Sequence, residues 1–341
     1  MERCLDLAQK ATGHTHPNPM VGSVIVYKNR IIGEGWHHKS GSAHAEVHAI
    51  NNVVDKSLLK FSTLYVNLEP CSHFGKTPPC ASLIMEHQIH RVVIGSMDPN
   101  PKVAGKGIAL LKASGCEVIT GVLENKCVEV NRRFFTFHQK KRPYILLKWA
   151  QSIDGFIAPL QKNKKKRAVF WISNTLSQQL SHQWRSEEAA ILVGVNTIID
   201  DDPKLTTRHW NEKNPLRIVI DPHNRSPKNA QVLSDDMPTL FLTRQNANPS
   251  NSNKEYVVLE PFSLKALMNF CYEREIISIL VEGGETTLSH FINENYWDEA
   301  RVFTAPKMLK EGIGSPKIKS APQKQLKIKE DQLEIFINKT V

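Results

Sequence analysis

Short apolar runs alternate with amphipathic stretches along the chain, and this pattern predicts strands and helices in regular succession. In the first part of the chain, helices are expected over 2–12, 43–54, 81–87, 107–113 and 124–137. Strands are expected over 21–27, 31–36, 63–68, 92–95 and 117–120. Strands and helices in this order are typical of a three-layer α/β/α sandwich.

A polar, basic segment that ends in proline, 138–143, interrupts this pattern. Beyond it the alternation starts again, with apolar strands expected over 144–149, 189–193, 217–220, 239–243, 277–281 and 299–304. A chain of 341 residues is long for one domain and comfortable for two. We therefore predict two α/β domains, over residues 1–139 and 140–341.

Composition excludes some classes of protein and leaves others open. No apolar run reaches about 18 residues, so no membrane span is expected, and the first residues lack the apolar core of a signal peptide. Six cysteines spread over this length suit a reducing compartment, so we expect a cytoplasmic protein. The formal charge of +10 is compatible with nucleic acid, an anionic small substrate or no specific partner. The basic run 164–167 has no aromatic residues among its charges and is interpreted as a solvated loop.

The candidate chemistry lies in two short segments of the first domain. His44, Cys71 and Cys80 provide one imidazole and two thiols, the ligand set of a catalytic zinc site, and Glu46 provides a carboxylate to move protons. Thr77 is expected to cap a helix with Cys80 in its first turn, where a thiolate is favoured. The alternative is a pair of buried free cysteines and a capping histidine. The spacing His-x-Glu and Pro-Cys-x8-Cys is similar to that of zinc-dependent nucleobase deaminases.

Further motifs extend this resemblance over essentially the whole chain. They are the segments 16–19, 44–46, 69–80 and 98–107, then 147–155, 171–173, 193–203, 205–208 and 281–284. In this order they resemble the bifunctional riboflavin-biosynthesis deaminase–reductase family. The resemblance implies a cytidine-deaminase-like domain followed by a dihydrofolate-reductase-like α/β domain. It also implies deamination of 2,5-diamino-6-ribosylamino-4(3H)-pyrimidinone 5′-phosphate and then reduction of its ribosyl chain with NADPH, giving 5-amino-6-ribitylamino-uracil 5′-phosphate.

For the first domain, the resemblance implies one zinc ion held by His44, Cys71 and Cys80, with Glu46 as the proton carrier. Zinc lowers the pKa of a bound water from 15.7 to about 7. The family places a pyrimidine contact at Asn18. Contacts around the ribose phosphate correspond to His73, Lys76, Asp98 and Asn100.

For the second domain, the resemblance implies two groups of residues. The nicotinamide cofactor is expected against Ala150, Trp171, Thr197 and Asp201, and against a diphosphate cradle formed by Gly283, Gly284, Glu285, Thr286 and Thr287. A plain strand-to-helix glycine turn is the alternative for that cradle. Substrate contacts are expected from Arg185, Leu205, Arg208 and Glu282, and proton transfer from Lys148 and Glu282.

Two other functions remain open at this point. A nucleic-acid-editing deaminase is compatible with the zinc motif and the charge, although such enzymes have Cys-x2-Cys and no fused reductase. A deaminase with a non-catalytic second half is compatible with Val169 and Phe170, which replace the polar residues that usually precede Trp171 in the family. We expect a phosphorylated pyrimidine as the partner, no nucleic acid, no membrane, and a homo-oligomer, either a dimer or a tetramer.

Overall fold

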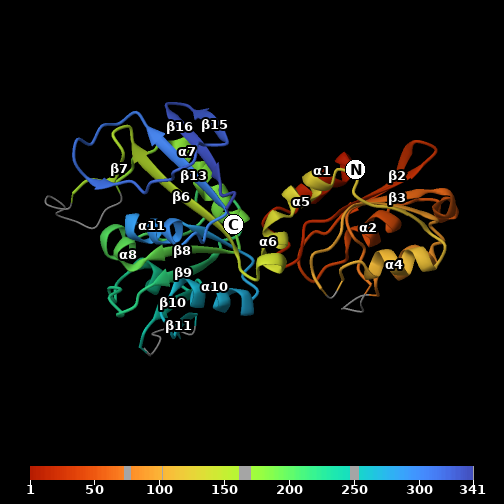
Figure 1. The fold of residues 1–341 in the computed structure, drawn as a ribbon, viewed down its shortest axis with the longest axis horizontal. Helices are drawn as coiled ribbons and strands as arrows, with labels where there is room; N and C mark the ends of the chain where they lie inside the picture. Colours follow the sequence, from red (N-terminus) through yellow and green to blue (C-terminus); the bar gives the residue numbers. More distant parts are fainter. Residues whose placement is uncertain (73–77, 102, 161–169, 246–252, 341) are drawn as a thin grey trace. The chain divides into compact units, whose positions relative to one another are not determined.

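The computed structural model describes residues 1–72, 78–101, 103–160, 170–245 and 253–340. The chain divides into two compact units, Met1–Lys141 and Arg142–Val341, each built around its own β-sheet (Figure 1). Arg142 belongs to the second unit through its contacts, because its guanidinium donates two hydrogen bonds to the buried carboxylate of Asp298, at 2.6 and 2.8 Å.

The first unit contains a five-stranded sheet in the order β2-β1-β3-β4-β5. Strand β1 is antiparallel to both neighbours, whereas β3, β4 and β5 are parallel. The strands are β1 Gly22–Tyr27, β2 Arg30–Trp36, β3 Thr63–Leu68, β4 Arg91–Ser96 and β5 Glu117–Ile119. Since β3 and β4 are parallel, the residues that follow them meet at one edge of the sheet.

Helices cover both faces of this sheet and confirm the three-layer prediction. Successive residues of β1 point to opposite faces. On one face Ile25 packs in a core with α2, α3 and α4, and on the other Val24 packs against α1. The helices are α1 Glu2–Gln9, α2 Ala45–Asn51, α3 Cys80–Glu86 and α4 Lys106–Ala113, with a 3-10 turn, η1, at Lys56–Phe61.

Two local predictions for this unit were wrong. The single helix expected over 124–137 is broken into α5 Glu124–Val130 and α6 Arg132–Lys140. Asn131 lies at the break. Its side-chain oxygen accepts a hydrogen bond from the N–H of Met20 at 2.8 Å, and its NH₂ group donates to the carbonyl of Met20 at 2.9 Å. Helix α3 begins at Cys80, and its N-cap residue is Pro79 rather than the expected Thr77. Thr77 itself lies outside the described residues.

The second unit contains a nine-stranded sheet in the order β11-β10-β9-β8-β12-β6-β13-β16-β15. Seven neighbouring strands from β11 to β13 are parallel, and the β15–β16 hairpin is antiparallel. The strands are β6 Tyr144–Ser152, β8 Ala190–Gly194, β9 Leu216–Ile220, β10 Thr239–Thr243, β11 Lys254–Val258, β12 Ser278–Val281, β13 Glu299–Ala305, β15 Lys324–Ile328 and β16 Asp331–Ile337. A separate two-stranded sheet pairs β7 Phe156–Ala158 with β14 Ile313–Gly314.

Helices lie on both faces of this sheet as well. Successive residues of β6 show the division, since Ile145 packs with α10 and α11 while Leu146 packs with Trp184 of α7. The helices are α7 Thr175–Glu187, α8 Val195–Asp201, α9 Gln231–Ser234, α10 Leu264–Glu273 and α11 Glu285–Asn293. Strands β7, β11, β14, β15 and β16 were not expected from the sequence. Strand β15 is an edge strand with four exposed residues, so it has little of the apolar signal on which such a prediction depends.

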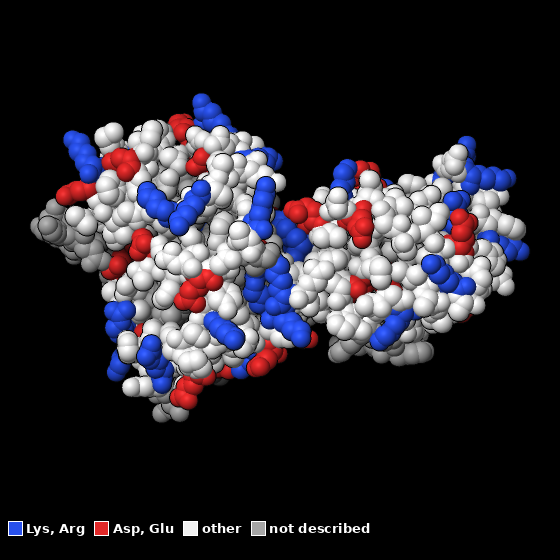
Figure 2. Space-filling model, viewed as in Figure 1, with Lys and Arg blue, Asp and Glu red and all other residues white. Residues whose placement is uncertain are grey.

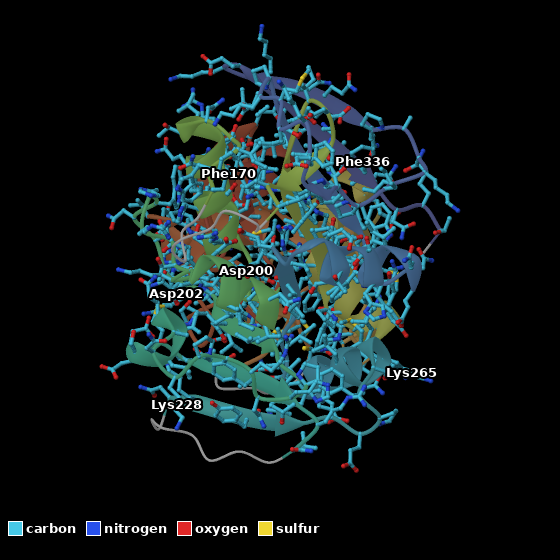
Figure 3. The ribbon with its side chains drawn as sticks, turned by 90° about the vertical axis from the view of Figure 1, so that its left-hand side faces the viewer. Phe170, Asp200, Asp202, Lys228, Lys265 and Phe336 are labelled. Carbon is cyan, nitrogen blue, oxygen red and sulfur yellow. The ribbon has the colours of Figure 1, made fainter. Side chains whose placement is uncertain are left out.

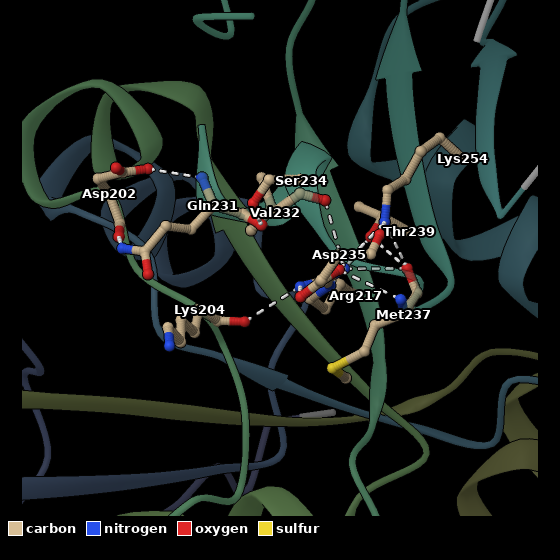
Figure 4. A network of polar contacts seen from close by, with 10 residues as sticks. All are labelled: Asp202, Lys204, Arg217, Gln231, Val232, Ser234, Asp235, Met237, Thr239 and Lys254. Carbon is tan, nitrogen blue, oxygen red and sulfur yellow. Dashed lines mark hydrogen bonds and ion pairs between the residues drawn. The ribbon is translucent and has the colours of Figure 1, made fainter. Parts of the chain in front are cut away.

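A buried polar network joins β9, β10 and β11 (Figure 4). The side chains of Arg217 and Lys254 are fully buried, and both bind the partly exposed carboxylate of Asp235. Arg217 also donates to Thr239 Oγ1 at 2.9 Å and to the carbonyl of Lys204 at 3.2 Å. The network therefore holds the start of the segment that carries Leu205 and Arg208 against the sheet.

Among the described residues, no helix is long and apolar enough to span a bilayer. Lysine and arginine side chains are spread over the visible face of both units, with acidic side chains between many of them (Figure 2).

Asp235→Asn should destabilise the second unit by about 3 kcal/mol, because it removes the carboxylate that binds two buried cations, although Asp236 stays near Lys254. Urea unfolding followed by tryptophan fluorescence measures this, since most tryptophans belong to this unit. Glu255→Gln is the matched control. It breaks the half-exposed pair with Arg274 and should change stability by at most about 1 kcal/mol. Equal effects of the two substitutions would contradict the prediction.

Candidate active sites

Three candidate zinc ligands meet at the edge of the first sheet. His44 is the N-cap residue of α2, Cys80 is the first residue of α3, and Cys71 follows the end of β3. One ligand atom from each lies within 4.8 Å of the other two. His44 Nδ1 lies 3.2 Å from Cys80 Sγ and 3.5 Å from Cys71 Sγ.

This group fits a zinc ion. Ligand atoms that share a tetrahedral zinc lie roughly 3.5 Å apart, given zinc–sulfur bonds of about 2.3 Å and zinc–nitrogen bonds of about 2.0 Å. Hydrogen bonds from Cys80 and His44 outweigh burial and lower the pKa of Cys71, which favours the thiolate that binds metal. The backbone N–H of Cys80 also points at Cys71 Sγ, at 3.3 Å. Three protein ligands leave the fourth position for water, as in catalytic zinc sites.

Glu46 lies in the first turn of α2 and is not one of the three ligands. Its side chain is 3% exposed and lines the same cavity, which has a volume of about 190 Å³. Burial raises the pKa of Glu46, although the nearby His44 opposes that shift. A carboxyl group with a raised pKa beside a zinc site is suited to accept and return a proton.

Asn18 lines this cavity and is held by His37. His37 Nδ1 lies 3.1 Å from the carbonyl oxygen of Ala43, so this nitrogen carries the proton. Nε2 is then an acceptor for the Asn18 amide N–H, at 3.2 Å. Burial lowers the pKa of His37, which keeps the ring neutral and preserves this arrangement.

Asp98 and Asn100 follow β4 and line the cavity from the neighbouring strand end. The N–H of Asn100 donates to Asp98 Oδ1 at 2.8 Å. Burial raises the pKa of Asp98 to about 6, although the Asn100 bond opposes this. His73 and Lys76 lie outside the described residues, so their predicted roles are not tested.

The second unit contains a larger cavity, of about 470 Å³. Its lining includes Phe170 and Asp200, which are labelled in Figure 3. The cavity brings together every residue that the sequence placed at the cofactor, and both candidates for proton transfer. These are Ala150, Trp171, Thr197, Asp201, Gly283, Gly284, Glu285, Thr286 and Thr287, together with Lys148 and Glu282.

The segment between β12 and α11 forms one wall of this cavity. Gly284 is the N-cap residue of α11, so the free N–H groups of the first turn are available to a phosphate. A Cβ atom on Gly283 would lie 2.8 Å from Thr287 Cβ, and one on Gly194 would lie 2.6 Å from Thr287 Oγ1. Both glycines therefore pack against Thr287, where a larger side chain would not fit, and the free N–H groups at the start of α11 remain the feature that suits a phosphate.

Glu282 is at the centre of a buried ionic cluster. Arg185 Nε and Nη2 each donate to its carboxylate at 2.8 Å, and Lys148 Nζ lies 3.9 Å from Oε2. Burial alone would raise the pKa of Glu282, but the charges of Arg185 and Lys148 outweigh it and lower this pKa to about 2. Burial lowers the pKa of Lys148, and Glu282 opposes that shift.

Of the residues predicted to contact the substrate, Glu282 lines the cavity, whereas Arg185, Leu205 and Arg208 do not. The Leu205 side chain is 2% exposed and packs in the core with Ile198, so only its backbone can contact a substrate. Arg208 is exposed overall, but part of its side chain is buried. This partial burial lowers the pKa of Arg208, and the nearby charge of Arg185 lowers it further.

Known protein families match the two units separately. Residues 1–96 match the family described as "Cytidine and deoxycytidylate deaminase zinc-binding region", and residues 143–341 match the "RibD C-terminal domain". The chain is 43% identical to the riboflavin biosynthesis protein RibD of Aquifex aeolicus, over 98% of this chain and 94% of the relative. The chain belongs to the RibD family. The RibD of Escherichia coli strain K12 is 35% identical over 96% of this chain and 94% of its own length.

Solved structures of RibD proteins share the whole fold. A diaminohydroxyphosphoribosylaminopyrimidine deaminase/5-amino-6-(5-phosphoribosylamino)uracil reductase from Thermotoga maritima superposes with a TM-score of 0.86 at 35% identity, covering 98% of this chain and 96% of that one. RibD from Acinetobacter baumannii superposes with a TM-score of 0.89 at 30% identity, covering 98% and 97%. The predicted fold class, a cytidine-deaminase-like domain followed by a reductase α/β domain, is confirmed, and the second domain is the C-terminal domain of RibD. Zinc and NADPH are the cofactors of these two RibD units, and His44, Cys71 and Cys80 could bind the metal.

Three buried polar residues in or beside these RibD sites were not found from the sequence. Glu69 and His37 line the first cavity, and His182 of α7 lies beside Arg185. Burial and the charges of Arg185 and Arg208 lower the pKa of His182 to about 3, and its ring lies 4.7 Å from that of His209. Glu69 had a usable signal, an acidic residue directly after an apolar strand. The histidines had none, because their importance depends on neighbours that are distant in sequence.

Cys80→Ser should remove most of the zinc, since it takes away one of two sulfur ligands. Elemental analysis of the purified chain measures the loss against an expected one ion per chain. Cys116→Ser is the matched control, because Cys116 is a buried thiol of the same unit that donates to the carbonyl of Ile89. Full zinc occupancy in Cys80→Ser would contradict the proposed ligand set.

The stability of the second unit should fall as the pH falls from about 4.5 to about 2. The folded pKa of Glu282 lies below its ordinary value, so folding favours the ionised form and this stabilisation is lost as the group protonates. The shift corresponds to roughly 3 kcal/mol. Glu282→Gln should flatten this part of the curve, and Glu255→Gln should not. Urea unfolding at a series of pH values measures it, and parallel curves for wild type and Glu282→Gln would contradict the assignment.

Proposed function

We propose that this chain performs two consecutive steps of riboflavin biosynthesis at two separate sites. The first unit deaminates 2,5-diamino-6-ribosylamino-4(3H)-pyrimidinone 5′-phosphate hydrolytically. The second unit reduces the ribosyl chain of the product with NADPH to give 5-amino-6-ribitylamino-uracil 5′-phosphate. The observation that carries this proposal is the group of His44, Cys71 and Cys80 beside a buried Glu46 in a chain of the RibD family.

In the first site, His44, Cys71 and Cys80 would hold a zinc ion, which would lower the pKa of a bound water to about 7. Glu46 accepts one proton from this water and passes it to the ring nitrogen as the hydroxyl adds to the ring carbon. It then carries the remaining proton of that hydroxyl to the amino group, so that the C–N bond breaks, C=O forms and ammonia leaves. Asn18, oriented by His37, hydrogen-bonds the pyrimidine. Asp98 and Asn100 contact the ribose phosphate side of the substrate, with His73 and Lys76 assigned to the same region by family correspondence alone.

In the second site, bound NADPH would supply the hydride that reduces the sugar carbon. The N–H groups at the start of α11 would hold the cofactor phosphates, and Trp171, Thr197 and Asp201 line the rest of the cavity. A proton must reach the ribosyl oxygen as the ring opens, and Lys148 provides it because burial lowers its pKa. Glu282 stays ionised, so it orients Lys148 and Arg185 rather than donating a proton itself. Arg185 and Arg208 attract the substrate phosphate.

The two alternative functions have less support. A nucleic-acid-editing deaminase does not account for the second unit or for RibD relatives over the full chain. A non-catalytic second half is hard to reconcile with the intact contact between Arg185, Glu282 and Lys148. Val169 lies outside the described residues, and Phe170 is half-exposed. A homo-oligomer and a cytoplasmic location remain predictions, and light scattering would measure the former.

Glu46→Gln should retain zinc and lose deamination by more than the roughly 10²–10⁴-fold of one acid–base step, because the residue moves several protons. The assay follows ammonia release from the diamino substrate and, separately, NADPH oxidation with the deaminated substrate. Reduction should be unaffected in this variant. Loss of both activities in Glu46→Gln would contradict two independent sites, and a wild type that releases no ammonia would overturn the proposed function.

A further inference from the structure

Glu69 holds the loop between β4 and α4 with a buried carboxylate. Its side chain is 4% exposed, and both oxygens accept hydrogen bonds from backbone N–H groups. Oε2 accepts from Asp98 at 3.3 Å and from Gly105 at 2.9 Å. Oε1 accepts from Gly107 at 3.0 Å and from Ile108 at 3.2 Å.

The backbone packs closely at the same point. A Cβ atom on Gly107 would lie 2.0 Å from the carbonyl oxygen of Pro70, so the start of α4 rests directly on the segment that leads to Cys71. Gly105, whose N–H is one of the four donors, has a φ of +78°, a conformation that side chains rarely adopt. The loop is therefore shaped to place its N–H groups around one anion.

The Glu69 carboxylate connects two different parts of the deaminase cavity, the zinc ligands and the loop between β4 and α4. Glu69 is two residues from the zinc ligand Cys71, whereas the loop carries Asp98 and Asn100, which line the substrate side. Cys71 has support of its own, because its carbonyl accepts the N–H of Ala81 at 3.1 Å. Loss of the carboxylate should therefore move the substrate side more than the ligand side.

We propose that Glu69 is a positioning residue for substrate binding in the deaminase, fixing Asp98 and Asn100 relative to the zinc ligands. This inference rests on the proposed deaminase function. The negative charge is essential, because four N–H donors converge on two oxygens and a neutral amide offers only one acceptor. In Glu69→Gln the amide NH₂ would face two N–H donors, and half of the loop would lose its partner.

The test uses the full-length zinc-loaded chain and compares wild type with Glu69→Gln. The KM for the diamino substrate should rise about tenfold or more while kcat changes by less than about threefold, because ground-state binding is lost and the chemistry is retained. Zinc content and NADPH oxidation with the deaminated substrate should be unchanged. Glu69→Asp keeps the charge on a shorter side chain and should give an intermediate KM.

Asp55→Asn is the matched control, since it also replaces a carboxylate that accepts a backbone N–H in this unit, at an exposed position away from the cavity. It should leave KM unchanged. A KM in Glu69→Gln within about twofold of wild type, or a loss of zinc and kcat at constant KM, would overturn the positioning role alone. Failure of both Glu69 variants to fold the first unit, with reduction intact, would make Glu69 purely structural and also overturn it. A wild type without deamination would overturn the proposed function as well.

Discussion

The first site depends on one geometric constraint, that three ligand atoms from distant parts of the sequence stay within 4.8 Å of one another. The fold meets it by starting two helices, α2 and α3, beside the end of β3. Helix starts leave backbone N–H groups free, and one of these points at Cys71 Sγ, so the backbone helps to stabilise the thiolate before any metal binds. The same edge of the sheet carries the loop after β4. Ligands and substrate contacts are thus brought together by the parallel pairing of two strands.

Both units use buried carboxylates to organise a site, but in different ways. Glu69 accepts four backbone donors, so it fixes the course of the chain. Glu282 binds the side chains Arg185 and Lys148, so it fixes charges rather than backbone. Asp235 does the latter for Arg217 and Lys254 at the far side of the second sheet. In each case the groups that bind the carboxylate are shielded from water, which strengthens their electrostatic interaction with it.

The sequence was informative where function depends on residue type and short spacing. The zinc ligands, Glu46 and the glycine-rich start of α11 could be found in this way, and so could the buried strands of both sheets, whose apolar runs are strong. Other features depend on contacts between distant segments. The break at Asn131 comes from its bonds to Met20, and the orientation of Asn18 comes from His37. Leu205 could be assigned to the substrate by its motif, but only the structure places its side chain in the core.

The hairpin of β15 and β16 closes one side of the nine-stranded sheet, and its outer strand has consequences for aggregation. Strand β15 exposes Lys324 and Lys327 along an edge whose backbone groups are otherwise open to pairing. Repeated lysines on an edge strand disfavour the approach of a second strand, because two such edges would bring like charges together. The same lysines give β15 a weak apolar pattern, which is why the strand was not predicted, and they also disfavour extension of the sheet by a further strand.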